Sequence, residues 1–138
     1  MEATTIQKPS NQSTEQNMLD YFATHDVKYV ADDGVFVHMG TGEKYKGRAE
    51  VGAMLNYFYH VAFDARAEMT HYMISENQAT IEGFFKGTHI GEFAGVAATN
   101  REVNVPICVT YNLENGLIKE ARIYMPGEVL MKQLSVLP

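Results

Sequence analysis

The chain has 138 residues, 46% of them hydrophobic and 20% charged, which is typical of one globular domain with a sizeable core. It carries 11 Lys and Arg against 17 Asp and Glu, for a formal net charge of -6. An acidic chain of this size is repelled by phosphate backbones and anionic lipid surfaces, so nucleic acid and membranes are poor partners.

The N-terminal segment divides into a polar tail and a helix. Residues 1–12 contain Pro9 and show no apolar period, which predicts a disordered tail ahead of a single domain over residues 13–138. The capping-box pattern Ser13-x-x-Gln16 predicts that a helix begins near Ser13. The buried stripe of this helix would be formed by Met18, Leu19 and Phe22.

The next segments predict short strands and a second helix. Residues 24–36, THDVKYVADDGVF, are typical of a short helical turn that enters a strand over residues 35–38. GTGEKYKG, residues 40–47, indicates a turn with a short strand. Residues 48–63 carry apolar side chains at helical spacing and predict the clearest helix of the chain.

From residue 65 the apolar period changes to two, as in strands. Antiparallel strands are predicted over 65–73, 78–93, 101–113 and 117–125, and Pro126 could open a final helix that carries Leu130 and Leu134. This order of elements predicts an α+β fold, in which a strongly bent antiparallel sheet wraps around helices as a cone-like barrel. The apolar hollow of such a barrel is a usual place for a small ligand.

Glycines recur every four residues in GTHIGEFAG, residues 87–95. The surrounding period of two excludes a shared helical face for them. We expect Gly87 and Gly91 to lie on one side of a strand together with His89, at places where the strand bends. Gly95 would lie in the loop beyond.

Several stretches resemble a known family. FFKGTHIGEFAGVAATNREVNVP (84–106), LENGLIKE (113–120) and LMKQLSVLP (130–138) resemble the SnoaL-like polyketide cyclases of the nuclear-transport-factor-2-like superfamily. YFATHDVKYVADDGVFVHMGTGEKYKG (21–47) is similar as well. The resemblance implies a cone-like α+β barrel with a ligand hollow, often dimeric through sheet faces. It also implies a cofactor-independent cyclase or isomerase that acts on an apolar, polyketide-like carbonyl compound.

The sequence departs from this family at the residues that would carry the chemistry. The acid–base aspartate of the aromatic polyketide cyclases aligns with Ile123, and two polar partners on the preceding strand align with Ile107 and Val109. The aspartate that many broader relatives keep before the last helix aligns with Pro126. Apolar side chains cannot transfer a proton, so the usual acid–base residue is replaced.

Two histidines are candidate catalytic residues. His71 shares an apolar-rich strand face with Met69 and Met73. If that face lines the hollow, His71 could act as a general base, and otherwise it would be a satisfied histidine at a rim or subunit interface. His89 would either point at the ligand across a floor kept open by glycines or hydrogen-bond a nearby loop.

The ligand pocket is expected to draw on the first strand, the second helix and the long strands. Its expected lining residues are His38, Met54, Tyr57, Phe58, Phe85, Val105, Ile107, Val109, Tyr111, Ile123 and Met125. The five histidines show neither H-x-x-x-H spacing nor a Cys–His cluster, so we expect no metal and no cofactor.

The expected partners are a small apolar molecule and a second copy of the chain. No run of 18 apolar residues occurs, and the first 17 residues lack the basic end and apolar run of a signal peptide. The single cysteine, Cys108, cannot form an internal disulfide, which fits a reducing compartment. We therefore expect a cytoplasmic protein.

The sequence leaves three functions open. The first is an acid–base enzyme that cyclises, isomerises or dehydrates a small carbonyl compound. The second is a non-catalytic protein that holds an apolar ligand through burial alone. The third is a dimeric domain without a ligand, whose core would be filled.

Overall fold

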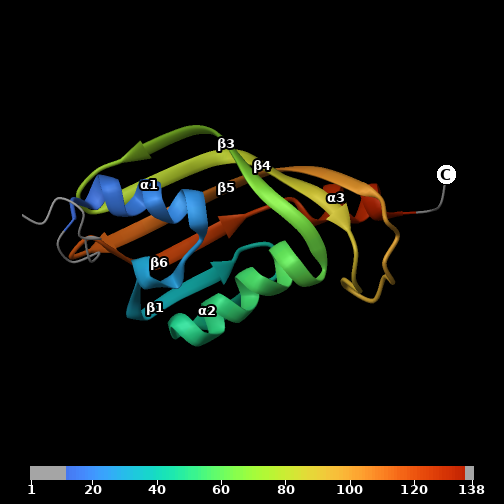
Figure 1. Cartoon of the computed structure of the whole chain (residues 1–138), viewed down its shortest axis with the longest axis horizontal. Coiled ribbons are helices and arrows are strands. Elements are labelled where there is room, and N and C mark those ends of the chain that lie inside the picture. The colour runs from blue at the N-terminus through green and yellow to red at the C-terminus, as the bar shows by residue number, and fades with distance from the viewer. Residues whose placement is uncertain (1–11, 136–138) are drawn as a thin grey trace, which may run out of the picture.

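A computed structural model describes residues 12–135 of the protein (Figure 1). The elements in chain order are α1 (Thr14–Thr24), a 3-10 turn (Val27–Tyr29), β1 (Val30–His38), β2 (Glu43–Lys46), α2 (Gly47–Asn56), a π-helical turn (Tyr57–Val61), β3 (Phe63–Ile74), β4 (Gln78–His89), β5 (Glu102–Glu114), β6 (Leu117–Tyr124) and α3 (Gly127–Leu134). The predicted tail over residues 1–12 lies outside the described residues except for its last residue.

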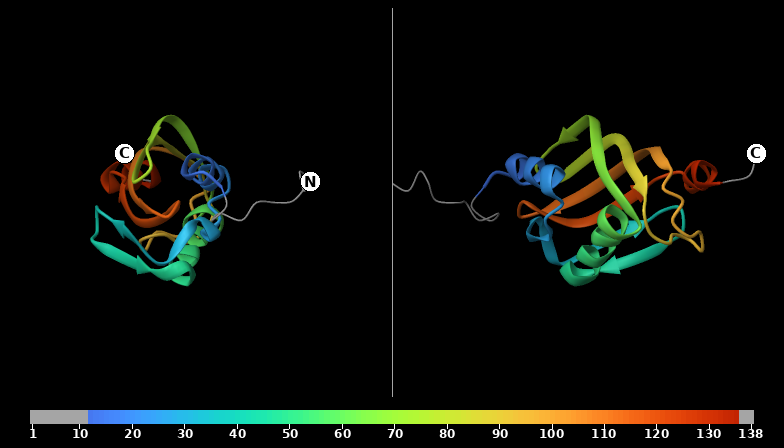
Figure 2. Two further views of the ribbon diagram at one scale, coloured as in Figure 1. Left: turned by 90° about the vertical axis from the view of Figure 1, so that its left-hand side faces the viewer. Right: turned by 45° about the vertical axis from the view of Figure 1, so that its right-hand side comes forward.

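The six strands form one sheet in the order β2-β1-β6-β5-β4-β3. Neighbouring strands are antiparallel except β1 and β6, which are parallel. The sheet curls strongly, and α1 and α2 lie against its concave side while α3 lies near one end (Figures 1 and 2). The predicted α+β fold with a strongly bent sheet is confirmed, with one parallel pairing.

The helix boundaries follow from local capping. Ser13 caps α1, because its Oγ accepts a hydrogen bond from the backbone N–H of Gln16 at 3.1 Å. Pro126 precedes α3, whose Leu130 and Leu134 are each 1% exposed, as the sequence predicts. The predicted helix over 48–63 is shorter, because its α-helical part ends at Asn56 and a π-helical turn follows.

The first strand begins five residues earlier than predicted, at Val30. Val30 pairs with Ile118 of β6, and the register then shifts before the regular pairing resumes at Val35. Asp32 and Asp33 occupy this irregular part and are exposed. The two aspartates therefore lie within a bulged strand, where the sequence suggests a break.

Close approach of β3 and β4 explains one of the glycines in the 87–95 stretch. A Cβ atom on Gly87 would lie 2.3 Å from the carbonyl oxygen of Asp64 and 2.6 Å from the Cβ of Ala65. Any side chain there would collide with the neighbouring strand. The expectation that Gly91 belongs to the same strand is wrong, because β4 ends at His89. Gly95 lies in the following loop with a φ of +82°.

Two clusters of buried side chains form the core. One joins α1, β1, α2, β5 and β6, and the other surrounds Phe63 and Phe85 beneath α3. A ligand cavity lies where the two clusters meet. No helix within residues 12–135 combines the length and the apolarity needed to cross a lipid bilayer.

Candidate functional site

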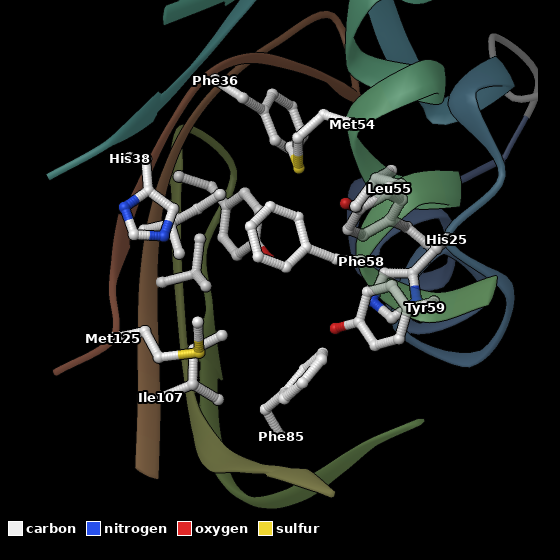
Figure 3. Close-up of a pocket in the computed structure, with 14 residues that line it drawn as sticks. His25, Phe36, His38, Met54, Leu55, Phe58, Tyr59, Phe85, Ile107 and Met125 are labelled. Carbon is white, nitrogen blue, oxygen red and sulfur yellow. The ribbon is translucent and has the colours of Figure 1, made fainter. Parts of the chain in front are cut away.

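An interior chamber lies between the concave side of the sheet and the helical layer (Figure 3). Its volume is about 60 Å³, taken as the space open to the centre of a water molecule. The chamber is lined by Tyr21, His25, Phe36, His38, Met54, Leu55, Phe58, Tyr59, Phe85, Ile107, Val109, Tyr111, Ile123 and Met125. The lining is apolar and aromatic except for two imidazoles and three phenol groups, and no Asp, Glu, Lys or Arg of residues 12–135 contributes to it.

Nine of the eleven residues expected to line the pocket also line this chamber. Tyr57 lies instead in a neighbouring groove, where its hydroxyl donates a hydrogen bond to the carbonyl oxygen of Glu92 at 2.8 Å. Val105 is fully buried in the cluster beneath α3 and does not reach the chamber. Alternation along β5 puts Val105 on the correct face, but packing against α3 covers it.

His38 stands at the edge of the chamber with its ring stacked on that of Phe58, at a centroid distance of 6.1 Å and an interplanar angle of 15° (Figure 3). Its side chain is 9% exposed, and its buried Nδ1 has no hydrogen-bond partner among residues 12–135. Burial lowers the pKa of His38, and the carboxylate of Glu43 raises it by a smaller amount. The imidazole is therefore neutral near pH 7 and can accept a proton.

Three tyrosine hydroxyls belong to the chamber, from Tyr21, Tyr59 and Tyr111. Within residues 12–135, none of the three donates a hydrogen bond to another side chain or to the backbone. Burial raises the pKa of Tyr59 to about 12 and raises that of Tyr21 and Tyr111 as well, so the three phenols keep their protons. The hydroxyl of Tyr59 points into the chamber (Figure 3). Each of these hydroxyls can donate a hydrogen bond to a polar guest atom or to water.

His25 also lines the chamber, a position that the sequence analysis does not predict. It ends α1 in the left-handed conformation, with a φ of 55°, and its ring stacks on Tyr59 at a centroid distance of 4.6 Å. Burial, and to a smaller extent the neighbouring His60, lowers the pKa of His25 to about 4. A signal was present, because Tyr21 and His25 are four residues apart and therefore share one face of α1.

The π-helical turn Tyr57–Val61 explains why two consecutive aromatic residues face the interior. Phe58 and Tyr59 both line the chamber. Such turns insert a residue into a helix and often occur at functional sites. The backbone N–H of Ala62 closes this turn by donating to the carbonyl oxygen of Tyr57 at 2.7 Å.

A larger groove opens beside the chamber and has a volume of about 710 Å³ by the same measure. His38, Met54, Phe58 and Met125 line both spaces and thus form the wall between them. The outer side of the groove is formed by β2, α2 and the loop around Phe93. Movement of the flexible methionines or of the Phe58 ring would join the two spaces.

The SnoaL-like polyketide cyclase family model matches residues 14–134 of the chain. The chain belongs to this family. Solved structures share its fold, among them a SnoaL-like polyketide cyclase from Agrobacterium tumefaciens C58, with a TM-score of 0.72 and 18% identity over 90% of this chain and 99% of that one. AclR from Streptomyces galilaeus, described as a hydroxylase, has a TM-score of 0.74 and 20% identity over 91% and 97% of the two chains.

A third structure, a protein from Jannaschia sp. CCS1 described as a SnoaL-like polyketide cyclase, gives a TM-score of 0.78 at 15% identity over 91% and 93% of the chains. At these identities the likeness shows the fold alone. No curated protein matches the chain significantly.

Ile123, at which the sequence resemblance led us to expect the family's acid–base aspartate, faces the chamber. Ile123 on β6 lines it, together with Ile107 and Val109 of β5. Ile123 is the direct partner of Val109 on one side and of His38 on the other. His38, Ile123 and Val109 therefore form a row across three neighbouring strands, and His38 is the titratable side chain of this row.

The two histidines suggested by the sequence lie outside this SnoaL-like chamber. Of the two alternatives for His71, the one in which its strand face lines the hollow does not match the structure, because the His71 side chain is 78% exposed and its Nδ1 lies 3.7 Å from Glu82 Oε1. The register of β3 shifts between Met69 and His71, so His71 pairs with Glu82 on the outer face of the sheet, whereas the next residue, Tyr72, contacts Phe22 of α1 on the inner face.

His89 is fully buried at the end of β4, but it does not line the chamber. Its Nδ1 accepts a hydrogen bond from the backbone N–H of Thr99 at 3.1 Å and lies 2.9 Å from the Thr99 hydroxyl. His89 thus holds the 90–100 loop, which is the second of the two alternatives suggested by the sequence. Among residues 12–135 no three His, Cys, Asp or Glu side chains gather as metal ligands would.

Proposed function

We propose that this SnoaL-like protein binds a small, largely apolar carbonyl compound and that His38 exchanges a proton with it. The observation that carries this proposal is the imidazole of His38, which is 9% exposed and has an unpaired buried nitrogen at the edge of an apolar chamber. A neutral imidazole in a dry site is a competent general base near pH 7. No cofactor is needed for such a step.

The tyrosine hydroxyls supply the complementary part of the reaction. Tyr21, Tyr59 and Tyr111 keep their protons and have no other partner in residues 12–135. They can donate hydrogen bonds to a carbonyl oxygen, which becomes negatively charged when the base removes a proton from the adjacent carbon. This division of roles supports an isomerase or aldol cyclase in which His38 replaces the usual aspartate.

The bicyclic ketone 2-tetralone in D2O provides a direct test, because its C1 protons exchange for deuterium when a base removes them. The protein is expected to accelerate this exchange, and His38→Gln is expected to reduce it to the background rate. His71→Gln should keep the exchange of the wild type, since His71 lies outside the chamber. An equal rate in the wild type and His38→Gln, with 2-tetralone still bound, would exclude the acid–base role.

A non-catalytic ligand-binding protein is the second candidate function. Its support is the lining itself, which contains no carboxylate and is formed mostly by aliphatic and aromatic groups. Burial alone stabilises an apolar ligand by about 25 cal/mol per Å² of apolar surface removed from water. Native mass spectrometry of protein purified from its own host would then show a bound small molecule. An empty chamber together with no binding of 2-tetralone would favour the third alternative, a dimeric domain without a ligand.

A cytoplasmic homodimer remains part of the proposal. Its support is a pair of exposed large apolar side chains on the outer side of the sheet, where Met73 is 76% and Tyr124 45% exposed. Light scattering would measure the mass of the particle in solution. A monomer at all concentrations would contradict the expected dimer.

A further inference from the structure

The charged side chains that line the groove beside the chamber are all negative. Among the described residues, Glu43 on β2 and Glu50 on α2 are the only side chains lining it that are charged at neutral pH, and no Lys or Arg of this part of the chain lines it. The β2 strand alternates Glu43, Lys44, Tyr45 and Lys46. Glu43 and Tyr45 face the groove, whereas the two lysines lie on the other face of the strand.

Neither groove carboxylate has a cationic partner within residues 12–135. Glu50 Oε1 accepts a hydrogen bond from the backbone N–H of Lys46 at 2.8 Å, which caps α2. Glu43 Oε1 accepts one from the hydroxyl of Thr41 at 3.3 Å. Burial and an interaction with the Glu43 carboxylate raise the pKa of the Tyr45 hydroxyl, which therefore stays neutral. The contacts of both carboxylates are thus with neutral groups, and neither gains a positively charged partner within the described residues.

Aromatic rings form the other walls of the groove. Tyr45, Tyr57, Phe58 and Phe93 line it, and the ring of Phe93 lies 6.3 Å from that of Tyr57 and 5.6 Å from that of Phe58. A positive charge is attracted to the face of such rings within about 6 Å. Carboxylates combined with aromatic walls are a chemical environment that favours an ammonium group over a neutral or anionic one.

An independent feature points to a ligand in the same place. His38 lines the groove as well as the chamber and is paired directly with Glu43 across β1 and β2. Its buried Nδ1 has no partner within the described residues, although nine-tenths of the side chain is removed from solvent. A buried polar group in this state requires a partner, and a molecule that spans the wall between the groove and the chamber would lie against it.

We propose that the ligand is an amphipathic amine, whose apolar body enters the chamber and whose ammonium group lies in the groove near Glu43 and Glu50. This inference rests on the proposed binding function and names the class of molecule. The wall between the two spaces consists of His38, Met54, Phe58 and Met125, so a ligand that bridges them displaces flexible side chains. The net charge of -6 adds a long-range attraction for cations.

Three probes share one apolar body and differ in the charge of the head group: 4-phenylbutylamine, 4-phenylbutan-1-ol and 4-phenylbutanoate. Comparing them separates the contribution of the charge to the binding free energy from that of the buried apolar surface. Calorimetric titration at pH 7 should give about fivefold tighter binding of the amine than of the alcohol, and the weakest binding for the carboxylate. The amine's advantage should shrink as salt is added.

The variants Glu43→Gln and Glu50→Gln retain an acceptor oxygen for Thr41 and Lys46 while removing the charge. Each should reduce the advantage of the amine over the alcohol about twofold, and the double variant should abolish it. Glu102→Gln is the matched control, because Glu102 is exposed at the start of β5 and does not line the groove. It should keep the preference of the wild type.

The outcomes distinguish the proposed ammonium site from the proposed ligand-binding function on which it rests. Equal affinity of the amine and the alcohol, with both bound, would overturn the ammonium site and leave the proposed binding function intact. A preference for the amine that survives the double variant would also overturn it. Failure of all three probes and of 2-tetralone to bind would overturn the binding function, and with it the inference.

Discussion

His38 on β1 and Ile123 on β6 are direct partners in the parallel pairing of these two strands. The family resemblance expects an aspartate at the position of Ile123, so the titratable group of this row lies one strand away, on β1. The pairing brings the two side chains onto the same face of the sheet, and both line the chamber. This relationship leads to a direct test of the site.

Ile123→Asp should raise the pKa of His38, by about 1 unit or more, because a carboxylate beside the ring stabilises the imidazolium. In the wild type, burial lowers this pKa, so the ring stays neutral to a lower pH than a free histidine. The NMR chemical shift of the His38 ring as a function of pH measures the change. Ile123→Asn is the control, since it is nearly isosteric with the aspartate and carries no charge. The same midpoint in both variants would show that residue 123 and the His38 ring do not interact.

Tyr59→Phe and Tyr111→Phe should each weaken the binding of 2-tetralone about three- to tenfold, because each removes a hydrogen bond worth about 0.5–1.5 kcal/mol. Tetralin, the same bicycle without the carbonyl oxygen, is the matched ligand. Its affinity should stay the same or rise slightly, since the variants make the chamber more apolar. Equal losses for both ligands would indicate that the hydroxyls support the fold rather than the ketone.

His25 should make the protein less stable in mild acid. Its pKa is about 4 in the folded state against 6.5 for a free histidine, because burial opposes the charged form. The unfolded chain therefore binds more protons between these two values, and the free energy of unfolding falls as the pH drops from 6.5 to 4. The loss from this group amounts to at most about 3 kcal/mol.

The variant His25→Asn isolates this contribution, since asparagine tolerates the left-handed backbone at the end of α1. Urea unfolding at several pH values should show a smaller loss of stability for the variant between pH 6.5 and 4. The carboxyl groups titrate in both proteins, so they cancel in the difference. Parallel pH curves for the two proteins would contradict the burial of the His25 ring.

Gly87→Ala should destabilise the protein by about 1–3 kcal/mol or prevent folding, because the added Cβ would lie 2.3 Å from the carbonyl oxygen of Asp64. Gly127→Ala is the matched control. A Cβ there meets no heavy atom within 4 Å, and the residue begins α3, so the change should be neutral or slightly stabilising. Urea unfolding measures both, and a neutral Gly87→Ala would show that β3 and β4 can separate without cost.

The sequence could predict much of the fold because local chemistry determined it. The Ser13 cap, the apolar spacing in α2 and the period of two in the long strands each depend on neighbours along the chain. Alternation in β5 correctly put Ile107, Val109 and Tyr111 on the inner face. The family motifs added the curl of the sheet, which the period alone does not specify.

The site was less predictable for reasons that concern contacts between distant segments. The face of β3 that carries His71 looks suitable for a hollow, but the register shift between Met69 and His71 turns the His71 side chain to the outer face of the sheet. Val105 lies on the predicted inner face of β5, but α3 packs over it and separates it from the chamber. His25 has an ordinary position at a helix end, and its burial arises from Tyr59, 34 residues away in the chain.

The sequence by itself determined an acidic α+β domain of the SnoaL-like family with an apolar residue at position 123, because periodicity, turns and motifs are properties of contiguous residues. Only the tertiary structure decided which polar groups surround the hollow. Strand pairing brought His38 beside Ile123 and Glu43 beside His38, and helix packing brought three tyrosine hydroxyls to the same chamber. The physical reason is that burial, which lowers the pKa of His25 and His38, depends on side chains that meet only when the sheet closes around the helices.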